Sequence, residues 1–243
     1  MTHKNEIKCE ITWLGQAGFL IQTDKVRLVV DPYLSDSLSE KGIERLFSVP
    51  VAISELNPDI VCFTHDHADH FDEQTILPLI AMYPSCRFIG PTSVYEHYCR
   101  LNLNPAAFTI LDCEDVHAED TLHVHAVTAY HTDKYAIGLV IKLANRCIYI
   151  SGDTLLENGL LESVLKTVDC QIDVVLICIN GKLGNMNAHD AVKVVGQLKP
   201  KIAIPMHYGL FADNTVDPTV FVESVARLGI KCVTMEPGKP MQF

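Results

Sequence analysis

The stretch that decides the fold is Thr64-His65-Asp66-His67-Ala68-Asp69-His70-Phe71-Asp72, which holds three histidines and three aspartates. It directly follows an apolar run at residues 60–63, and a short run of this kind predicts a buried strand. The rigid ends of strands are where α/β folds place their chemistry. Imidazole and carboxylate groups at this density suit zinc or a similar divalent metal far better than a packed core. His65 and His67 alternate by two, so they can point the same way from an extended segment.

Length and composition describe one ordinary globular domain, predicted to span residues 1–243. The chain has 243 residues, of which 48% are hydrophobic and 20% are charged, as is usual for a soluble protein. The net charge of −11 argues against a nucleic acid partner, which would need clustered Lys and Arg. A local positive site is still compatible with this charge, because bound metal ions can outweigh the carboxylates around them.

The sequence favours a cytoplasmic location. Residues 1–8 contain no apolar segment that could serve as a signal peptide. No uncharged apolar run approaches the roughly 20 residues that span a bilayer, so no membrane association is expected. Nine cysteines are an odd number without a Cys-x-x-Cys pair, and several lie in apolar runs, which indicates buried free thiols in a reducing compartment.

Two packed sheets with helices outside fit the order of the predicted elements. The first half is rich in strands and then alternates strands with helices, and the second half repeats that order from about residue 122. Strands are expected at residues 10–22 (a pair or one bulged strand), 26–30, 60–63, 87–89, 108–111, 122–130, 136–143, 146–150, 172–179, 201–206 and 230–235. Helices are expected at residues 73–82 with a kink or break at Pro78, from residue 91, and at 155–166, 188–198 and 218–228.

Three later polar residues also stand directly after predicted strands: His131, Asp153 and His207. A lone histidine at a strand end is more often an ordinary loop residue than a ligand, but three such positions beside the histidine-rich stretch reverse that weighting. With His65, His67, Asp69 and His70 of that stretch, they make seven candidate ligands. Seven is enough for two tetrahedral or five-coordinate metals with room for water. Asp31 also ends a strand, where it either terminates that strand before a proline or supports a ligand.

With these residues in place, the chain resembles the metallo-β-lactamase-fold hydrolase superfamily over about residues 31–207. The resemblance implies an α/β (α+β) fold, a four-layer αββα sandwich with metals at the mouth between the sheets. Asp31 matches the family's aspartate that orients a metal-ligand histidine. The implied ligands of the first metal are His65, His67 and His131, and those of the second are Asp69, His70 and His207, with Asp153 bridging.

Residues 179–187 and 205–209 resemble more narrowly the L-ascorbate 6-phosphate lactonase-like branch, which is associated with manganese or zinc. This implies two divalent ions, Zn²⁺ or Mn²⁺ with iron as an alternative, and a metal-bound hydroxide that attacks a carbonyl or phosphoryl centre. Asp69 would orient that hydroxide or pass a proton to the leaving group. The expected substrate is small and anionic, a sugar-phosphate lactone or a phosphodiester. Its candidate contacts are Lys182, Asn185, Tyr208 and His189, for which a solvated loop and a packed tyrosine are equally open interpretations.

Two other functions are alternatives to the hydrolysis of a small molecule. A nuclease or phosphodiesterase of the same fold is disfavoured by the acidic net charge and by the lack of an added nucleic-acid-binding domain. A non-hydrolytic metal-binding sensor or redox partner is disfavoured because diiron relatives usually carry an acidic residue where His67 stands. No Gly-x-Ser-x-Gly elbow or Walker motif is present. A homo-oligomer is compatible with His123 and His125, which are expected to face solvent or a subunit interface.

Overall fold

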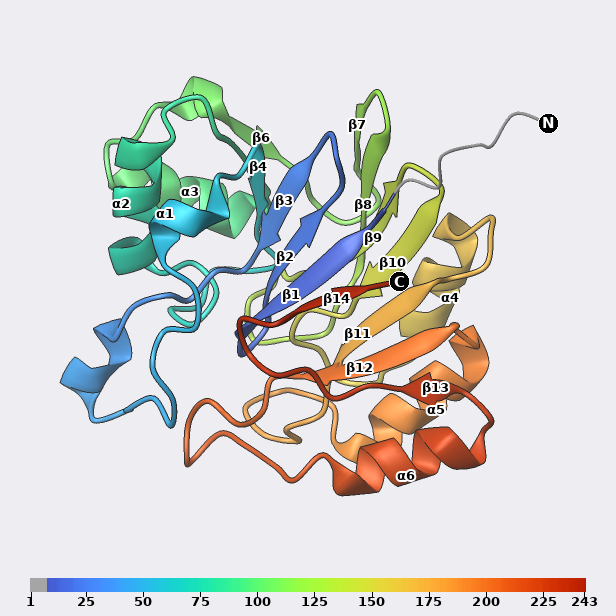
Figure 1. Cartoon of the computed structure of the whole chain (residues 1–243). Helices are drawn as coiled ribbons and strands as arrows, with labels where there is room; N and C mark the ends of the chain where they lie inside the picture. Colours follow the sequence, from blue (N-terminus) through green and yellow to red (C-terminus); the bar gives the residue numbers. More distant parts are fainter. Residues whose placement is uncertain (1–7) are drawn as a thin grey trace.

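Two seven-stranded sheets lie face to face at the centre of the structure, a computed structural model that describes residues 8–243 (Figure 1). The first sheet has the order β14-β1-β2-β3-β4-β5-β6 and the second the order β13-β12-β11-β10-β9-β8-β7. The strands of the first sheet are β1 (Glu10–Gly15), β2 (Gly18–Gln22), β3 (Arg27–Val30), β4 (Ile60–Cys62), β5 (Arg87–Gly90), β6 (Phe108–Ile110) and β14 (Pro240–Gln242). Those of the second are β7 (Val116–Glu119), β8 (Leu122–Thr128), β9 (Ile137–Leu143), β10 (Arg146–Ile150), β11 (Val174–Cys178), β12 (Ile202–Met206) and β13 (Lys231–Cys232).

Helices cover the outer faces of both sheets, which confirms the predicted four-layer sandwich (Figure 1). α1 (Ile53–Leu56), α2 (Glu73–Met82) and α3 (Thr92–Arg100) lie beside the first sheet. α4 (Leu160–Thr167), α5 (Ala188–Leu198) and α6 (Thr219–Arg227) lie beside the second. Two short 3₁₀ helices, Ser37–Lys41 and Pro105–Ala107, lie in connecting segments.

Side-chain alternation along the strands builds two separate apolar layers. In β3, Leu28 and Val30 belong to the cluster between the sheets, while Val29 belongs to the cluster under α1–α3. β4 repeats the pattern, since Val61 lies on the helix side and its two neighbours on the inner side. Successive side chains of a strand point to opposite faces, so a strand buried on both faces is apolar throughout. The continuous apolar runs of the sequence follow from this arrangement.

Several element boundaries differ from the prediction. α2 is not broken at Pro78, which is exposed, so water can solvate the carbonyl that the proline leaves unpaired. α4 begins at Leu160 rather than at residue 155, because Gly159 takes a left-handed backbone with φ of 98°. The last predicted strand is reduced to β13, and β7 and β14 were not predicted. β14 pairs with β1 and completes the edge of the first sheet.

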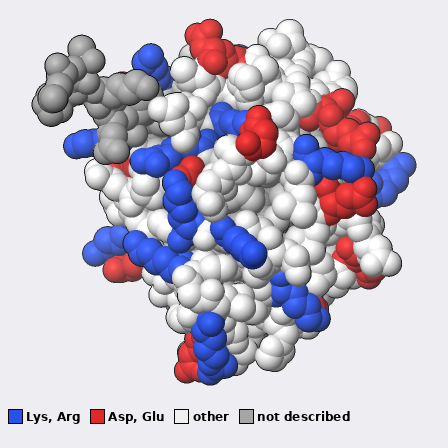
Figure 2. Space-filling model, turned by 90° about the vertical axis from the view of Figure 1, so that its right-hand side faces the viewer, with Lys and Arg blue, Asp and Glu red and all other residues white. Residues whose placement is uncertain are grey.

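The described surface carries charges of both signs. Figure 2 shows a face on which Lys and Arg side chains gather near the middle and Asp and Glu side chains gather towards one side. Some cations of the second sheet are paired with acids, as Lys201 Nζ is with Asp173 Oδ1 at 2.7 Å. None of the helices in residues 8–243 has the length and apolar character that crossing a membrane requires. The expectation that residues 1–8 hold no signal peptide falls almost wholly outside the described residues.

Candidate metal centre

The strand ends bring the predicted ligands to one edge of the sandwich. β3 and β4 are parallel neighbours, and β10, β11 and β12 are parallel neighbours in the other sheet. The carboxyl ends of parallel strands meet at the same edge of a sheet, where α/β folds bind ligands. Asp31 follows β3 and the histidine-rich loop follows β4, while Asp153 follows β10 and His207 follows β12. Each half-site therefore combines residues of the loop after β4 in the first sheet with residues that follow strands of the second sheet.

His65, His67 and His131 form the first group of converging donors. His67 Nδ1 lies 3.0 Å from His65 Nε2 and 3.2 Å from His131 Nε2. The ring planes of His65 and His67 meet at 78°, and those of His67 and His131 at 67°. The three rings therefore point their nitrogens at a common position instead of stacking on one another.

Asp69, His70 and His207 form the second group. Asp69 Oδ2 lies 3.5 Å from His207 Nε2 and 3.8 Å from His70 Nε2. The two imidazoles are fully buried, whereas the Asp69 side chain is 18% exposed. Asp69 is therefore the member of this group that reaches solvent.

Asp153 lies between the two groups. Its Oδ2 is 3.0 Å from His207 Nε2 and 3.9 Å from His131 Nε2, and its Oδ1 is 3.6 Å from His70 Nε2. The Asn185 side-chain amide donates to the same Oδ2 at 2.8 Å. One carboxylate thus faces both donor groups, which is the position that a bridging ligand needs.

Asp31 supports the histidines from behind. This fully buried carboxylate accepts hydrogen bonds from Thr64 N at 2.8 Å, from Thr64 Oγ1 at 2.6 Å and from His70 Nδ1 at 2.8 Å. Because the Thr64 hydroxyl donates to Asp31, its oxygen accepts from His65 Nδ1 at 3.0 Å. Although Asp31, His65 and His70 also lie close enough to hold an ion, the carboxylate is filled by these donors and orients the two histidines.

These outer hydrogen bonds fix which ring nitrogens keep a lone pair. His70 Nδ1 donates to Asp31 and His65 Nδ1 donates to the Thr64 hydroxyl oxygen. His131 Nδ1 donates to the Gly184 carbonyl at 3.1 Å. In the neutral form of each ring, Nε2 is then unprotonated and faces the interior of the cluster. His70 Nε2 and Asp153 Oδ1 are also buried without a hydrogen-bond partner in the described residues. Converging lone pairs with no proton between them fit a bound cation.

Burial and nearby charges shift the pKa values of the histidines of the two groups in opposite directions. Burial, reinforced by neighbouring histidines, holds the pKa of His65 well below its ordinary value, so this ring stays neutral. Burial also opposes protonation of His70, but the carboxylates of Asp153, Asp69 and Asp31 outweigh it and hold the pKa of His70 well above the ordinary value. Burial would raise the pKa of Asp153, but His207 and His70 outweigh it and hold this pKa well below the ordinary value. The second group therefore carries more negative charge to be balanced than the first.

The backbone is strained where it turns into the site. Gln16, Asp31 and His207 have φ of 51°, 42° and 61°, the left-handed region that non-glycine residues rarely adopt. Hydrogen bonds hold these turns, since His207 N and Trp13 Nε1 both donate to the Gln16 carbonyl, at 2.9 and 3.0 Å. The Gln16 side chain then donates to Asp69 Oδ2 at 2.8 Å. Strain of this kind is concentrated at functional sites.

The predicted substrate contacts are scattered. Lys182 is exposed and its Nζ donates to the Asp213 carbonyl at 2.9 Å, and Asn185 holds Asp153 as described. Tyr208 stacks on Trp13 with ring centroids 5.2 Å apart, and burial raises its pKa to about 12. His189 lies on the exposed face of α5. A substrate role for these residues stays a prediction.

Sequence reasoning missed three residues that hold the ligands: Gln16, Thr64 and Gly184. Gln16 carried a usable signal, because it is the one amide side chain inside the buried run of residues 11–21. Thr64 lies in the histidine-rich stretch of residues 64–72, but no role was predicted for it. Gly184 contributes only a backbone carbonyl, which leaves no mark in a list of side chains.

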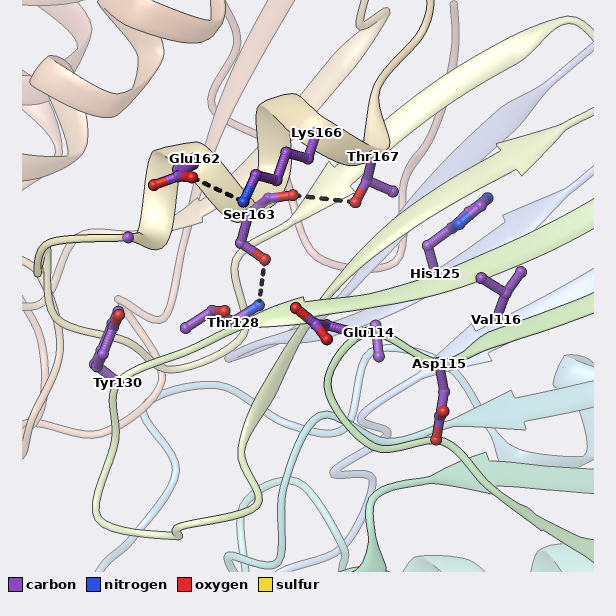
Figure 3. Close-up of a pocket in the computed structure, with 12 residues that line it drawn as sticks. Glu114, Asp115, Val116, His125, Thr128, Tyr130, Glu162, Ser163, Lys166 and Thr167 are labelled. Carbon is purple, nitrogen blue, oxygen red and sulfur yellow. Dashed lines mark hydrogen bonds and ion pairs between the residues drawn. The ribbon is translucent and has the colours of Figure 1, made fainter.

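Two hollows lie near the loops that follow β8. A cavity of about 490 Å³ adjoins the donor atoms, since His131 and Thr132 form part of its lining. A second cavity, of about 470 Å³, lies between α4 and the β7–β8 hairpin, and Figure 3 shows its polar lining. There Ser163 Oγ accepts from Thr128 N at 2.9 Å. None of the seven predicted ligands lines the second cavity, so only the first is continuous with the candidate metal centre.

A family comparison agrees with this geometry. The family described as "Beta-lactamase superfamily domain" matches residues 10–207, a span that contains all seven converging donors and Asp31. The chain belongs to the beta-lactamase superfamily. The resemblance recognised in the sequence is thereby confirmed at the level of the superfamily.

Known superfamily members match over nearly the whole chain. A protein of Methanosarcina mazei named "UPF0173 metal-dependent hydrolase" is 27% identical over 96% of this chain and 98% of its own length. Among solved structures, Igni18, a metallo hydrolase from Ignicoccus hospitalis, superposes with a TM-score of 0.80 at 21% identity, covering 97% of this chain and 98% of its own. An isothiocyanate hydrolase from Delia radicum gut bacteria superposes with a TM-score of 0.77 at 19% identity, covering 96% and 99%. The metallo-β-lactamase fold is therefore shared along the full length.

Proposed function

We propose that this chain is a metal-dependent hydrolase that holds two divalent ions, Zn²⁺ or Mn²⁺ with iron as an alternative. The main observation behind this proposal is that seven donors converge in two groups that share Asp153. Outer hydrogen bonds orient the histidines so that their lone pairs face these groups. The names of the Methanosarcina relative and of Igni18 support the same reaction class. Nitrogen and oxygen donors in this mixture suit all three metals.

The first ion would be held by His65, His67 and His131, and the second by Asp69, His70 and His207, with Asp153 shared. When bound, two divalent ions supply Lewis acidity and lower the pKa of water to about 7. The remaining work falls to the chain's own groups. Asp31 and Thr64 keep His70 and His65 in the tautomers that present Nε2.

We assign proton transfer to Asp69. Its side chain is the most exposed carboxylate of the site, at 18%, against 6% for Asp153 and complete burial for Asp31. Gln16 and the neighbouring histidines hold one of its oxygens, Oδ2. A positioned carboxylate that exchanges with solvent can accept a proton from the attacking water and return it to the leaving group.

The proposed substrate is a small molecule whose reacting end is rich in oxygen or anionic, with a lactone as the first choice. A phosphodiester is the second choice, and the position of Asp153 favours it, because paired ions can stabilise both the attacking and the leaving oxygen. A nuclease would show itself by turnover of RNA or cyclic phosphodiesters without turnover of lactones. A non-hydrolytic sensor or redox partner would be inert on all three classes while fully loaded with metal.

The decisive experiment combines metal analysis with a substrate panel. The purified protein is loaded separately with Zn²⁺, Mn²⁺ or Fe²⁺, its metal content is measured by mass spectrometry, and lactones, esters and phosphodiesters are assayed. His67→Ala should lower both metal content and turnover, because His67 Nδ1 faces the other two nitrogens of its group. His123→Ala is the matched control, since this histidine is exposed on β8. Unchanged metal content in His67→Ala refutes the assignment of the site.

We also retain the cytoplasm as the proposed location. All nine cysteines are free thiols, five of them buried, and a reducing compartment suits such usage. Labelling of the native protein in intact and lysed cells tests this location.

A further inference from the structure

We propose that the cavity beside His131 is a subsite for an uncharged apolar group of the substrate, so that the substrate has an oxygen-rich reacting end and an apolar tail. This inference rests on the proposed function, because it names the chemistry of the molecule that the metal centre would cleave. The cavity has a volume of about 490 Å³, within the range of small-molecule sites, about 300–1,000 Å³.

The cavity lies beside the first donor group. His131 is part of its lining, and His131 Nε2 lies 3.2 Å from His67 Nδ1. Thr132 is also part of the lining, and its Oγ1 lies 3.3 Å from His67 Nε2. A molecule whose reacting end is bound at the first donor group can therefore place its other end in the cavity.

The far wall is apolar and firmly built. Tyr130 and Leu155 face the cavity, and their backbones are joined because Leu155 N donates to the Tyr130 carbonyl at 2.9 Å. The Tyr130 hydroxyl donates to the Asn158 carbonyl at 2.5 Å, so the ring is held and its polar end is satisfied. Leu155 is nevertheless 41% exposed. An exposed leucine beside an aromatic ring in a preformed hollow offers apolar surface for a ligand to cover.

The charge of the lining selects against an anionic tail. Among the described residues, no lysine or arginine lines the cavity, and Glu157 is its one acidic member. A carboxylate or phosphate placed here would meet like charge and no cation to pair with, which is unfavourable in a partly desolvated site. An uncharged hydrocarbon or aryl group meets no such cost.

The lining of the cavity includes a glycine, Gly184. Its φ is +86°, and a Cβ at this position would lie 3.0 Å from His131 Nδ1. The glycine therefore lets the loop lie directly against the histidine while its backbone forms the side of the cavity.

The experiment measures how turnover depends on the length of an uncharged tail. The metal-loaded protein is assayed with γ-butyrolactone, γ-hexanolactone and γ-octanolactone, and with a sugar lactone that is polar throughout. Each buried methylene should raise kcat/KM about fourfold, the equivalent of about 0.8 kcal/mol. Leu155→Ser should reduce this increment to less than twofold, whereas Leu165→Ser, an equally simple change at an exposed leucine of α4, should leave it unchanged.

Hydrolysis whose kcat/KM does not depend on tail length, or depends on it equally in Leu155→Ser, overturns the inference but leaves the proposed hydrolase function standing. A higher kcat/KM for the sugar lactone than for the alkyl lactones also overturns the inference and not the hydrolase function. Glu157→Lys gives a second readout, because a tail ending in carboxylate should then be accepted better than by the wild-type protein.

If no lactone, ester or phosphodiester is cleaved, the proposed function fails, and binding decides the inference separately. Benzyl alcohol is then titrated into the ¹⁵N-labelled protein. Shifts of the Gly184 and Leu155 amide signals that are lost in Leu155→Ser support the subsite. The absence of shifts in the wild-type protein overturns it.

Discussion

Replacing Asp31 by Asn separates the support of the metal centre from the ligands themselves. The change keeps the shape of the side chain and removes one charge. In the structure, Asp31 Oδ2 accepts from Thr64 Oγ1 and His70 Nδ1, and Oδ1 accepts from Thr64 N. An amide has only one acceptor oxygen, so its NH₂ group must face a donor whichever way it is turned.

The magnitude follows from this count of bonds. With the amide oxygen in the Oδ2 position, two hydrogen bonds survive without charge assistance, and Thr64 N loses its acceptor in a fully buried place. A buried donor left unsatisfied costs about 1–3 kcal/mol, and weaker acceptance by a neutral oxygen adds about 1 kcal/mol. Asp31→Asn should therefore lower the free energy of unfolding by about 2–4 kcal/mol.

Metal binding should weaken as well, because His70 Nδ1 then donates to a neutral oxygen, which holds the Nε2 lone pair inward less firmly. Weakening of an outer partner of a metal-ligand histidine typically costs about 10–100-fold in metal affinity. Both donor groups feel the change, since Thr64 connects Asp31 to His65, but only the second group contains a histidine in direct contact with the changed side chain. The second ion should be lost first.

Two measurements check this prediction. Urea unfolding followed by tryptophan fluorescence gives the free energy, and competition with a chromophoric chelator gives the affinity of each ion. Asp24→Asn is the control, since Asp24 is exposed in the turn after β2. If Asp31→Asn kept both ions at the wild-type affinity, the supporting role drawn from the three hydrogen bonds would be refuted.

Three further outcomes are expected. Gln16→Leu should reduce turnover more than metal content, because it frees Asp69 from its 2.8 Å hydrogen bond; equal losses of both in assay and metal analysis would contradict this. Phe221→Ala should cost about 3–5 kcal/mol of unfolding free energy, since this side chain of α6 is fully buried, whereas Val220→Ala at a position 47% exposed should stay within about 0.5 kcal/mol in the same urea titration. Iodoacetamide at pH 8 should label the exposed Cys113 and Cys170 first, as peptide mass spectrometry can show. Burial raises the pKa of three other thiols to about 11 or 12, so their thiolate is scarce at pH 8 and they should react only after unfolding: Cys9, Cys86 and Cys178.

The strands and the convergence of candidate ligands at their ends could be predicted because both leave marks in the sequence. A strand buried on both faces is a short apolar run, and a polar residue directly after it stands out, as Asp153 does after β10. The prediction failed where the mark is absent. β14 consists of three residues with no apolar run, and only its pairing with β1 makes it a strand. At the start of the helix predicted from residue 91, the acceptor for Thr92 N and Oγ1 is Asp112, 20 positions away, which no local pattern marks.

The second layer of the site could not be read from the sequence for the same reason. Gln16 reaches Asp69 across 53 positions, and Asn185 reaches Asp153 across 32. The apolar run around Gln16 marks it as buried without naming its partner, and nothing local to Asn185 distinguishes it from a solvated side chain. The bond from Asn185 to Asp153 is therefore visible only in the structure, and a substrate contact by Asn185 stays a prediction.

The strained turns argue that this edge of the sandwich is shaped by its chemistry and not by stability. A non-glycine residue in the left-handed region costs about 1–3 kcal/mol, and glycine would remove that cost at Gln16, Asp31 or His207. Each of these residues instead keeps a side chain that faces the donors: one holds Asp69, one holds His70 and one is itself a donor. Three segments from two sheets accept strain at the same place, and in each the part that glycine would lack is the part that touches the site. Seven other non-glycine residues among those described also adopt this backbone, so it is the contacts of these three side chains, and not the strain alone, that support a functional centre here.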